Sequence, residues 1–291
     1  MTDQPLAGRS ALITGASRGL GLEIARHFVR TGADVFLCAR HADALEDARR
    51  TVAAEAPARR VLAAAGDVSD EADVRRITTA AVAAFPSLDV LVNNAGVYGP
   101  MGPIESTDVG AWRRAIDINL MGPMLMARAL VPQFKRCQRG KIIQISGAGA
   151  TKPLANLSAY AASKAAVVRL VETLAIELRP HAVDVNAVAP GALNTAMLDE
   201  VLAAGPDAVG REFYDRAVEQ KADGGTPPAR GAELCVFLAS PASDGITGKL
   251  IAAVWDPWRT LVAHRAELDG TDIYTIRRIL PEDRGTSFGP A

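Results

Sequence analysis

Short apolar segments alternate along this chain with longer segments of helical periodicity, from Ser10 to about Val188. We predict strands at 10–14, 34–38, 61–65, 88–92, 141–145, 183–188 and 249–254, and helices at 20–31, 42–55, 71–84, 109–135, 159–178 and 227–238. Strands that alternate with helices of this length form βαβ units, in which helices cover both faces of a parallel sheet. The sequence therefore predicts an α/β fold with a doubly wound parallel sheet.

No linker rich in proline, glycine or serine interrupts the alternation, so one domain is predicted over residues 1–254. The net charge of -1 gives no electrostatic reason to expect nucleic acid or an anionic membrane as a partner. The 3 cysteines are widely spaced and show neither a disulfide framework nor metal-ligand spacing, which suits a reducing compartment. The apolar runs are too short to span a bilayer, and the start of the chain lacks the features of a signal peptide. We expect a cytoplasmic protein without a metal.

A glycine-rich turn, Thr14–Gly21, stands between the first predicted strand and the first predicted helix. Glycine lets the backbone approach a phosphate closely, and the helix N-terminus supplies N–H groups and the positive end of its dipole. The spacing of Gly15, Gly19 and Gly21 differs from G-x-G-x-x-G. The position of the turn nevertheless predicts a dinucleotide site.

The end of the second predicted strand bears on the choice of dinucleotide. An acidic residue there would bond the ribose 2′-hydroxyl of NAD, whereas a basic residue suits the 2′-phosphate of NADP. The chain has Cys38-Ala39-Arg40 at this point, and Arg18 lies in the glycine turn. The sequence therefore favours NADP(H) over NAD(H).

Tyr160 and Lys164 lie four residues apart on a predicted helix and so face the same way. A nearby ammonium favours the phenolate form of a tyrosine, whose ordinary pKa is about 10. Such a phenol can exchange a proton at neutral pH, which the interconversion of an alcohol and a ketone requires.

These motifs occur together with others in the order and spacing of one family. The others are Asp67-Val68 after the third strand, Asn93–Gly96 after the fourth, Asn119 within a helix, and Pro190-Gly191 followed by Thr195. From about Leu6 to Val254 the chain resembles the classical short-chain dehydrogenase/reductase family, oxidoreductases built on one Rossmann-type domain. The resemblance implies a small-molecule substrate and a homodimer or homotetramer that pairs through helices 109–135 and 159–178.

The resemblance also implies a role for each matching residue. Tyr160 is expected to be the general acid for reduction or the base for oxidation, and Lys164 to hold the nicotinamide ribose and lower the pKa of Tyr160. Asn119 is expected to position a water that connects Lys164 with solvent. The expected cofactor-binding residues are Gly15, Ser17, Arg18, Gly19, Leu20, Gly21, Arg40, Asp67, Val68, Asn93, Ala95, Gly96, Tyr160, Lys164, Pro190, Gly191, Leu193 and Thr195.

Gly147 departs from the family pattern, which has a serine thirteen residues before the tyrosine. That serine hydrogen-bonds the substrate oxygen, and loss of one such donor commonly costs on the order of 10²-fold in rate. Three explanations are open. Ser146 donates instead, although strand alternation points it to the opposite face. A replacement comes from Thr151, Asn156, a backbone N–H of residues 147–149 or the substrate. Alternatively, the chain keeps only cofactor binding.

Two further segments lie outside the motifs. Residues 192–226 correspond to a helical lid over the substrate in the family, and a surface insertion is the alternative. Residues 255–291 form a C-terminal extension, in which Trp255 and Trp258 would mark a partner surface if both were exposed.

The sequence thus predicts an NADP(H)-dependent oxidoreductase that interconverts a carbonyl and a secondary alcohol on a small or medium-sized metabolite. Two alternatives remain: a redox-neutral enzyme, for example an epimerase that passes through a transient ketone, and a cofactor-binding regulatory or scaffold protein with a relic active site.

Overall fold

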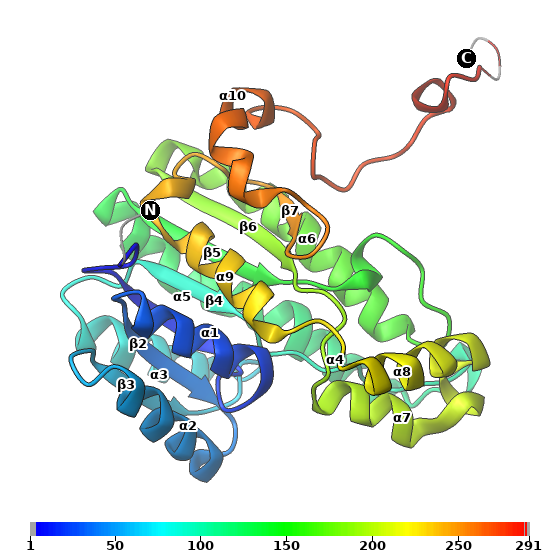
Figure 1. The fold of residues 1–291 in the computed structure, drawn as a ribbon, viewed down its shortest axis with the longest axis horizontal. Helices are drawn as coiled ribbons and strands as arrows, with labels where there is room; N and C mark the ends of the chain where they lie inside the picture. Colours follow the sequence, from blue (N-terminus) through cyan, green and yellow to red (C-terminus); the bar gives the residue numbers. More distant parts are fainter. Residues whose placement is uncertain (1–3, 288, 290–291) are drawn as a thin grey trace.

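The sheet is a single layer of seven parallel strands in the order β3-β2-β1-β4-β5-β6-β7, in a computed structural model that describes residues 4–287 and 289 (Figure 1). The strands are β1 Ser10–Thr14, β2 Asp34–Ala39, β3 Val61–Ala65, β4 Val90–Asn93, β5 Gly140–Ile145, β6 Val183–Ala189 and β7 Leu250–Ala252. Almost all residues of β1, β2, β4, β5 and β6 are buried, as expected for a parallel sheet covered on both faces, whereas most residues of the edge strands β3 and β7 are half-buried. The predicted α/β fold is confirmed.

Helices cover the two faces of the sheet as separate layers (Figure 1). One face carries α1 Gly19–Arg30, α2 Ala42–Glu55 and α9 Pro228–Ala239, and the other carries α3 Glu71–Ala84, α5 Gly122–Cys137 and α6 Ser158–Leu178. Helix α4 Val109–Ile116 contacts α6. Each layer packs its apolar side against the sheet and so forms a core cluster of its own. Two further helices, α7 Ala196–Val209 and α8 Arg211–Asp223, lie beyond one end of the sheet (Figure 1).

The strand order reverses between β1 and β4, because β2 and β3 extend the sheet on one side and β5, β6 and β7 extend it on the other. In open α/β sheets the crevice outside the carboxyl ends of two such strands is the usual ligand site. The glycine turn follows β1, and the Asn93–Gly96 segment follows β4. The topology therefore brings two of the predicted motifs to the same crevice.

Three details differ from the sequence-based expectation. The predicted helix 109–135 is interrupted by a π-helical turn, Asp117–Met121, between α4 and α5. The last strand is shorter than predicted, because Asp256 folds back and its carboxylate accepts a hydrogen bond from Ala252 N at 2.6 Å. Trp258 is buried, whereas Trp255 is exposed. The idea of two exposed tryptophans is therefore wrong for Trp258, whose ring packs 5.6 Å from that of Phe237.

The C-terminal extension is tied to the edge of the sheet before it leaves the body of the protein (Figure 1). After the short helix α10 Arg265–Leu268, the chain runs beside β7, and Leu250 N donates to Tyr274 O at 2.8 Å. The buried Lys249 ammonium donates to two carbonyls of the same segment, and Ile276 N donates to Glu172 on α6. The extension thus covers the exposed edge strand. Within the described part of the chain, none of the helices has the length and apolar character needed to cross a membrane.

Candidate active site

The glycine turn is fastened to the segment after β4 by a pair of polar side chains. Asn94 Nδ2 donates to the carbonyls of Thr14 and Gly15, at 3.0 and 3.1 Å. The Thr14 hydroxyl in turn accepts from the backbone N–H groups of Asn94 and Ala95. Gly15 has φ +64, and a Cβ there would lie 2.9 Å from the Cα of Ala95. Thr14 and Asn94 lie within the predicted motifs but are not among the expected cofactor-binding residues, and they hold Gly15 and Ala95 together.

The segment after β6 closes the crevice from the other side. Thr195 immediately precedes α7, and its Cγ2 lies 3.5 Å from the point where a Cβ on Gly19 would stand. Pro190 and Leu20 both approach Gly231 on α9, at 3.1 and 3.2 Å from its notional Cβ. The glycine turn, Pro190 and Thr195 therefore lie close together at this end of the sheet.

Arg18 and Arg40 lie near the carboxyl end of β2, next to the glycine turn. Ala16 N donates to Cys38 O at 3.1 Å, which places the glycine turn against the tip of β2. Arg18 and Arg40 are exposed there, and neither side chain is hydrogen-bonded or ion-paired among the residues described. Both guanidinium groups are free to meet an anion.

Asp67, an expected cofactor-binding residue, is held by protein side chains. Its carboxylate accepts hydrogen bonds from the Ser69 hydroxyl at 2.6 Å and from the Arg114 guanidinium. Burial acts to raise the pKa of Asp67, but the hydrogen bonds from Ser69 and Arg114 outweigh it and hold the pKa below its usual value. Neighbouring Val68 is buried, with Cγ2 2.9 Å from the notional Cβ of Gly122. Asp67 is therefore an ionised acceptor, oriented by Arg114, which belongs to none of the predicted motifs.

Asn119 lies in the π-helical turn and is almost completely buried. Its Oδ1 accepts from Val97 N at 2.9 Å, while its Nδ2 donates to Val97 O at 2.8 Å and to the Ser163 hydroxyl at 2.9 Å. A π-helical turn inside a helix often marks a functional site. The turn brings Asn119 next to Lys164: a Cβ on Gly96 would lie 3.3 Å from Asn119 Oδ1 and 3.5 Å from Lys164 Nζ.

Lys164 is buried, and its ammonium donates to Ile145 O at 3.0 Å. Burial without a carboxylate partner lowers the pKa of Lys164 to about 8. Its Nζ lies 5.6 Å from the centre of the Tyr160 ring, on the same helix. At neutral pH a positive charge therefore stands close to the phenol, although it does not bond the phenol directly.

Tyr160 projects from the first turn of α6 toward Gly147 at the end of β5. A Cβ on Gly147 would lie 2.3 Å from the Tyr160 hydroxyl, so the phenol oxygen fills the space of a side chain at position 147. Burial raises the pKa of Tyr160, and the nearby Tyr98 phenol adds to the rise. The expected lowering by Lys164 is not found in this arrangement of side chains, because desolvation dominates.

The candidate hydrogen-bond donors that could replace the serine differ in how close they lie to Tyr160. The Ser146 hydroxyl is enclosed and without a hydrogen-bond partner among the described residues. Thr151 is exposed, and Asn156 turns its amide toward Gly210, between α7 and α8. Only the turn that follows Gly147, Ala148–Ala150, stays beside the Tyr160 helix, where Gly149 meets Ala161.

The helices α7 and α8 form a small apolar cluster with the loop after β4. Leu198, Val201, Val209 and Ala217 are its buried members, and Tyr98, Met101, Leu202, Phe213 and Tyr214 pack against them. Tyr98 also contacts the Tyr160 ring, with centroids 4.7 Å apart. The predicted lid segment is therefore helical and reaches Tyr160 through Tyr98.

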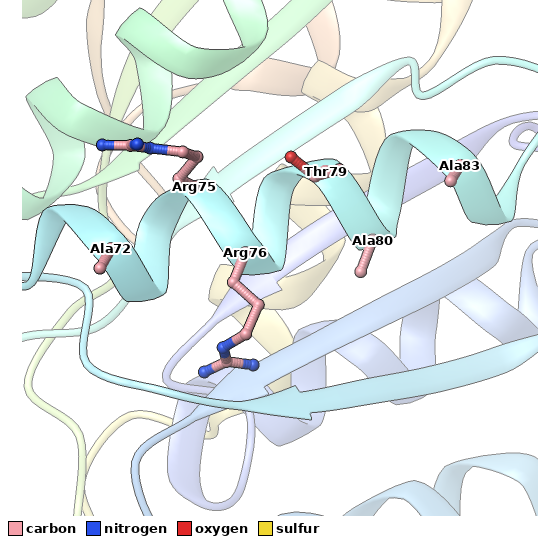
Figure 2. A pocket seen from close by; sticks show the side chains of 6 residues that line it. All are labelled: Ala72, Arg75, Arg76, Thr79, Ala80 and Ala83. Atoms are coloured by element: carbon pink, nitrogen blue, oxygen red, sulfur yellow. The ribbon is translucent and has the colours of Figure 1, made fainter.

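Two surface hollows lie away from these residues. One, of about 450 Å³, follows the outer side of α3 along Ala72, Arg75, Arg76, Thr79, Ala80 and Ala83 (Figure 2). The other, of about 610 Å³, lies at the amino-terminal ends of β5 and β6, where Lys141 is ion-paired with Asp184 at 2.6 Å and with Asp244 at 2.7 Å. Neither hollow includes a predicted site residue.

Comparisons with known proteins match this architecture. A family model described as short chain dehydrogenase matches residues 9–205. L-fucose dehydrogenase of Oryctolagus cuniculus is 37% identical over 238 residues, which cover 81% of this chain and 81% of that protein. Cis-4-hydroxycyclohexanecarboxylate dehydrogenase of Sinomonas cyclohexanicum is 35% identical over 251 residues, covering 86% and 96%. The crystal structure of levodione reductase aligns with a TM-score of 0.79 at 27% identity, over 89% of this chain and 99% of that one.

Proposed function

We propose, because this chain belongs to the short-chain dehydrogenase family, that it is an NADP(H)-dependent oxidoreductase whose general acid and base is Tyr160. The observation that carries the proposal is the convergence of Tyr160, Lys164 and Asn119 beside the glycine turn. The notional Cβ of Gly96, in the segment bonded to that turn, lies within 3.5 Å of both Asn119 and Lys164. The reaction proposed is the interconversion of a secondary alcohol and a ketone.

The residues present fit a dinucleotide. Gly15 and Gly21 leave no room for side chains: a Cβ on Gly21 would lie 2.3 Å from Gly15 O. The backbone there can reach a pyrophosphate at the N-terminus of α1, a helix of 12 residues. Thr195 and Pro190 would face the nicotinamide end. When bound, the nicotinamide supplies or accepts a hydride.

The chain's own residues would move the proton. Tyr160 gives its phenol proton to the substrate oxygen during reduction and takes it back during oxidation. Lys164 holds the ribose hydroxyls, and because burial lowers its own pKa only to about 8, its charge is present there at neutral pH. Asn119 fixes the loop after β4 through Val97 and borders the path by which the proton is replaced.

The choice of NADP(H) rests on charge at the tip of β2. Arg18 and Arg40 offer two unpaired guanidinium groups where a 2′-phosphate would lie, and the last residue of β2 is Ala39 rather than an acid.

We further propose that the alcohol or ketone lies on a ring. Sugar and cyclohexane alcohols are named for the two relatives, and in this chain α7 and α8 turn apolar side chains toward Tyr98 beside Tyr160. A ring offers the flat apolar surface that such a wall and an aromatic side chain can pack against.

The test is consumption of NADPH with 4-oxocyclohexanecarboxylate and other cyclic ketones, and formation of NADPH with L-fucose, for the wild type and Tyr160→Phe. Turnover by the wild type that falls about 10³-fold in Tyr160→Phe is expected. A product formed without net consumption of NADPH would instead favour the redox-neutral enzyme. Tight NADPH binding without turnover across the panel would favour the cofactor-binding protein.

A further inference from the structure

Gly147 is the residue around which the site departs from its family. Its backbone is fully extended, with φ -180 and ψ 178, a conformation that any residue adopts. The glycine is therefore explained by space and not by backbone strain. The space is taken by the Tyr160 hydroxyl, 2.3 Å from the notional Cβ. A side chain at position 147 and Tyr160 in this position exclude each other, so the second hydrogen bond to the substrate oxygen must come from elsewhere.

The other side-chain donors near Tyr160 are engaged or out of reach. The Ser146 hydroxyl is fully enclosed, so a substrate cannot contact it. The Ser163 hydroxyl donates to Tyr160 O at 2.8 Å and accepts from Asn119. Trp112 Nε1 donates to the hydroxyl of Ser158 at 3.1 Å.

Tyr98 differs from all of these. Its ring lies against that of Tyr160 with an interplanar angle of 55°, between Tyr160 and the helices α7 and α8. Neither phenol oxygen has a hydrogen-bond partner in the described structure, and neither is among its fully enclosed polar atoms. Burial raises the pKa of Tyr98, and the Glu200 carboxylate on α7 adds to the rise, so the phenol keeps its proton at neutral pH.

We propose that Tyr98 is a catalytic residue that donates the second hydrogen bond to the substrate oxygen, in place of the serine replaced by Gly147. This inference rests on the proposed oxidoreductase function. It also gives α7 and α8 a part in catalysis, because the cluster that they form with Tyr98 fixes the donor beside Tyr160. A neutral phenol is suited to the role, since it stabilises negative charge without giving up its proton.

The proton and electron balance is that of the proposed reaction. In reduction, bound NADPH would supply a hydride to the carbonyl carbon, and the π electrons of the C=O bond would move to oxygen. Tyr160 gives its proton to that oxygen and regains one from solvent, so that the ketone, NADPH and a solvent proton yield the alcohol and NADP⁺. Tyr98 donates a hydrogen bond throughout and transfers nothing.

The test is steady-state kinetics of Tyr98→Phe with NADPH and the cyclic ketones of the panel above. The variant removes one hydroxyl and keeps the ring that packs on Tyr160 and on α7 and α8. Removal of one oxyanion donor lowers kcat by about 10²-fold, and KM should stay within about threefold. Tyr274→Phe, which removes a tyrosine hydroxyl in the C-terminal extension, is the matched control and should behave as the wild type. The melting temperature and the NADPH Kd of Tyr98→Phe should be unchanged.

The two proposals fail differently. An active wild type, with Tyr98→Phe within about threefold of it in kcat, overturns the role of Tyr98 and leaves the proposed function standing. A rise in KM alone has the same meaning, because it shows that Tyr98 only shapes the pocket. A wild type that binds NADPH and reduces no ketone of the panel overturns the proposed function, and the role of Tyr98 with it.

Discussion

The nucleotide end of the candidate site and its substrate end differ in how their polar groups are held. At the nucleotide end, Thr14 and Asn94 bond the backbone on both sides of the crevice, and Asp67 is oriented by Ser69 and Arg114. At the substrate end, the phenols of Tyr98 and Tyr160 have no hydrogen-bond partners among the described residues. One end is built before any ligand arrives, whereas the other presents free hydroxyls to it.

The difference between the two ends indicates where the sequence of this chain can differ from its family without loss of the fold. The nucleotide end is constrained by close backbone contacts, such as the 2.3 Å between a notional Cβ on Gly21 and Gly15 O, so little can change there. At the substrate end, the Tyr160 hydroxyl occupies the space of a side chain at position 147, while the backbone of Gly147 keeps an ordinary extended conformation. Family membership therefore predicts the cofactor chemistry more firmly than the details of substrate contact.

The largest expected effect is that of Tyr160→Phe. Loss of the general acid should lower kcat by about 10³-fold and leave the NADPH Kd within about twofold, because the ring and Lys164 remain. Steady-state kinetics and fluorescence titration with NADPH measure the two quantities. A parallel loss of NADPH binding would contradict the distinction between the two ends, because it would mean that Tyr160 contributes to both NADPH binding and catalysis.

The motifs predicted much of this arrangement because they report local backbone requirements. A glycine turn between a strand and a helix, or a Tyr and a Lys one turn apart, is defined by residues close in sequence. Contacts across space were not accessible in the same way. That Trp258 packs on Phe237, or that Tyr160 fills the space beside Gly147, depends on how distant elements meet. Tyr98 belongs to no motif, and only its neighbours reveal it.

Gly147→Ala tests the space at the substrate end. A methyl group there would stand 2.3 Å from the Tyr160 hydroxyl, so the phenol must move, and we expect kcat to fall by about 10²-fold. Gly147→Ser is the matched variant, with the same Cβ and an added hydroxyl. Equal losses in both, measured as kcat with a cyclic ketone, would support the steric explanation. A serine variant faster than the wild type would contradict it and restore the serine as the missing donor.

Arg18→Ala and Arg40→Ala test the nucleotide end. Each removes one charge-assisted contact to a 2′-phosphate, so the NADPH Kd should rise about tenfold per arginine, while the NADH Kd stays within about twofold. Arg50→Ala, an exposed arginine on α2 that pairs with Glu46, is the control and should change neither. Equal weakening of both cofactors would show that the arginines do not read the phosphate.

The smallest expected effect is on stability, in Lys164→Met, and it connects the two ends of the site. The pKa of Lys164 is lowered to about 8 by burial, from an ordinary value of 10.5. Below pH 8 both folded and unfolded chains carry the proton, so the folded state bears the full cost of a buried charge. Between pH 8 and 10.5 only the unfolded chain keeps the proton, and the stability of the wild type should rise with pH.

Removing that charge should therefore raise the free energy of unfolding at pH 7, and the gain should shrink as the pH approaches 10. The cost of the buried charge is about 3 kcal/mol, and loss of the hydrogen bond to Ile145 O offsets about 1.5 kcal/mol of it. The net gain is about 1 to 2 kcal/mol, measurable by urea unfolding at pH 7 and pH 9.5. A variant less stable than the wild type at pH 7 would mean that the ammonium is satisfied within the folded protein. In that case the polar groups of the substrate end would also be satisfied within the folded protein, apart from the phenols of Tyr98 and Tyr160.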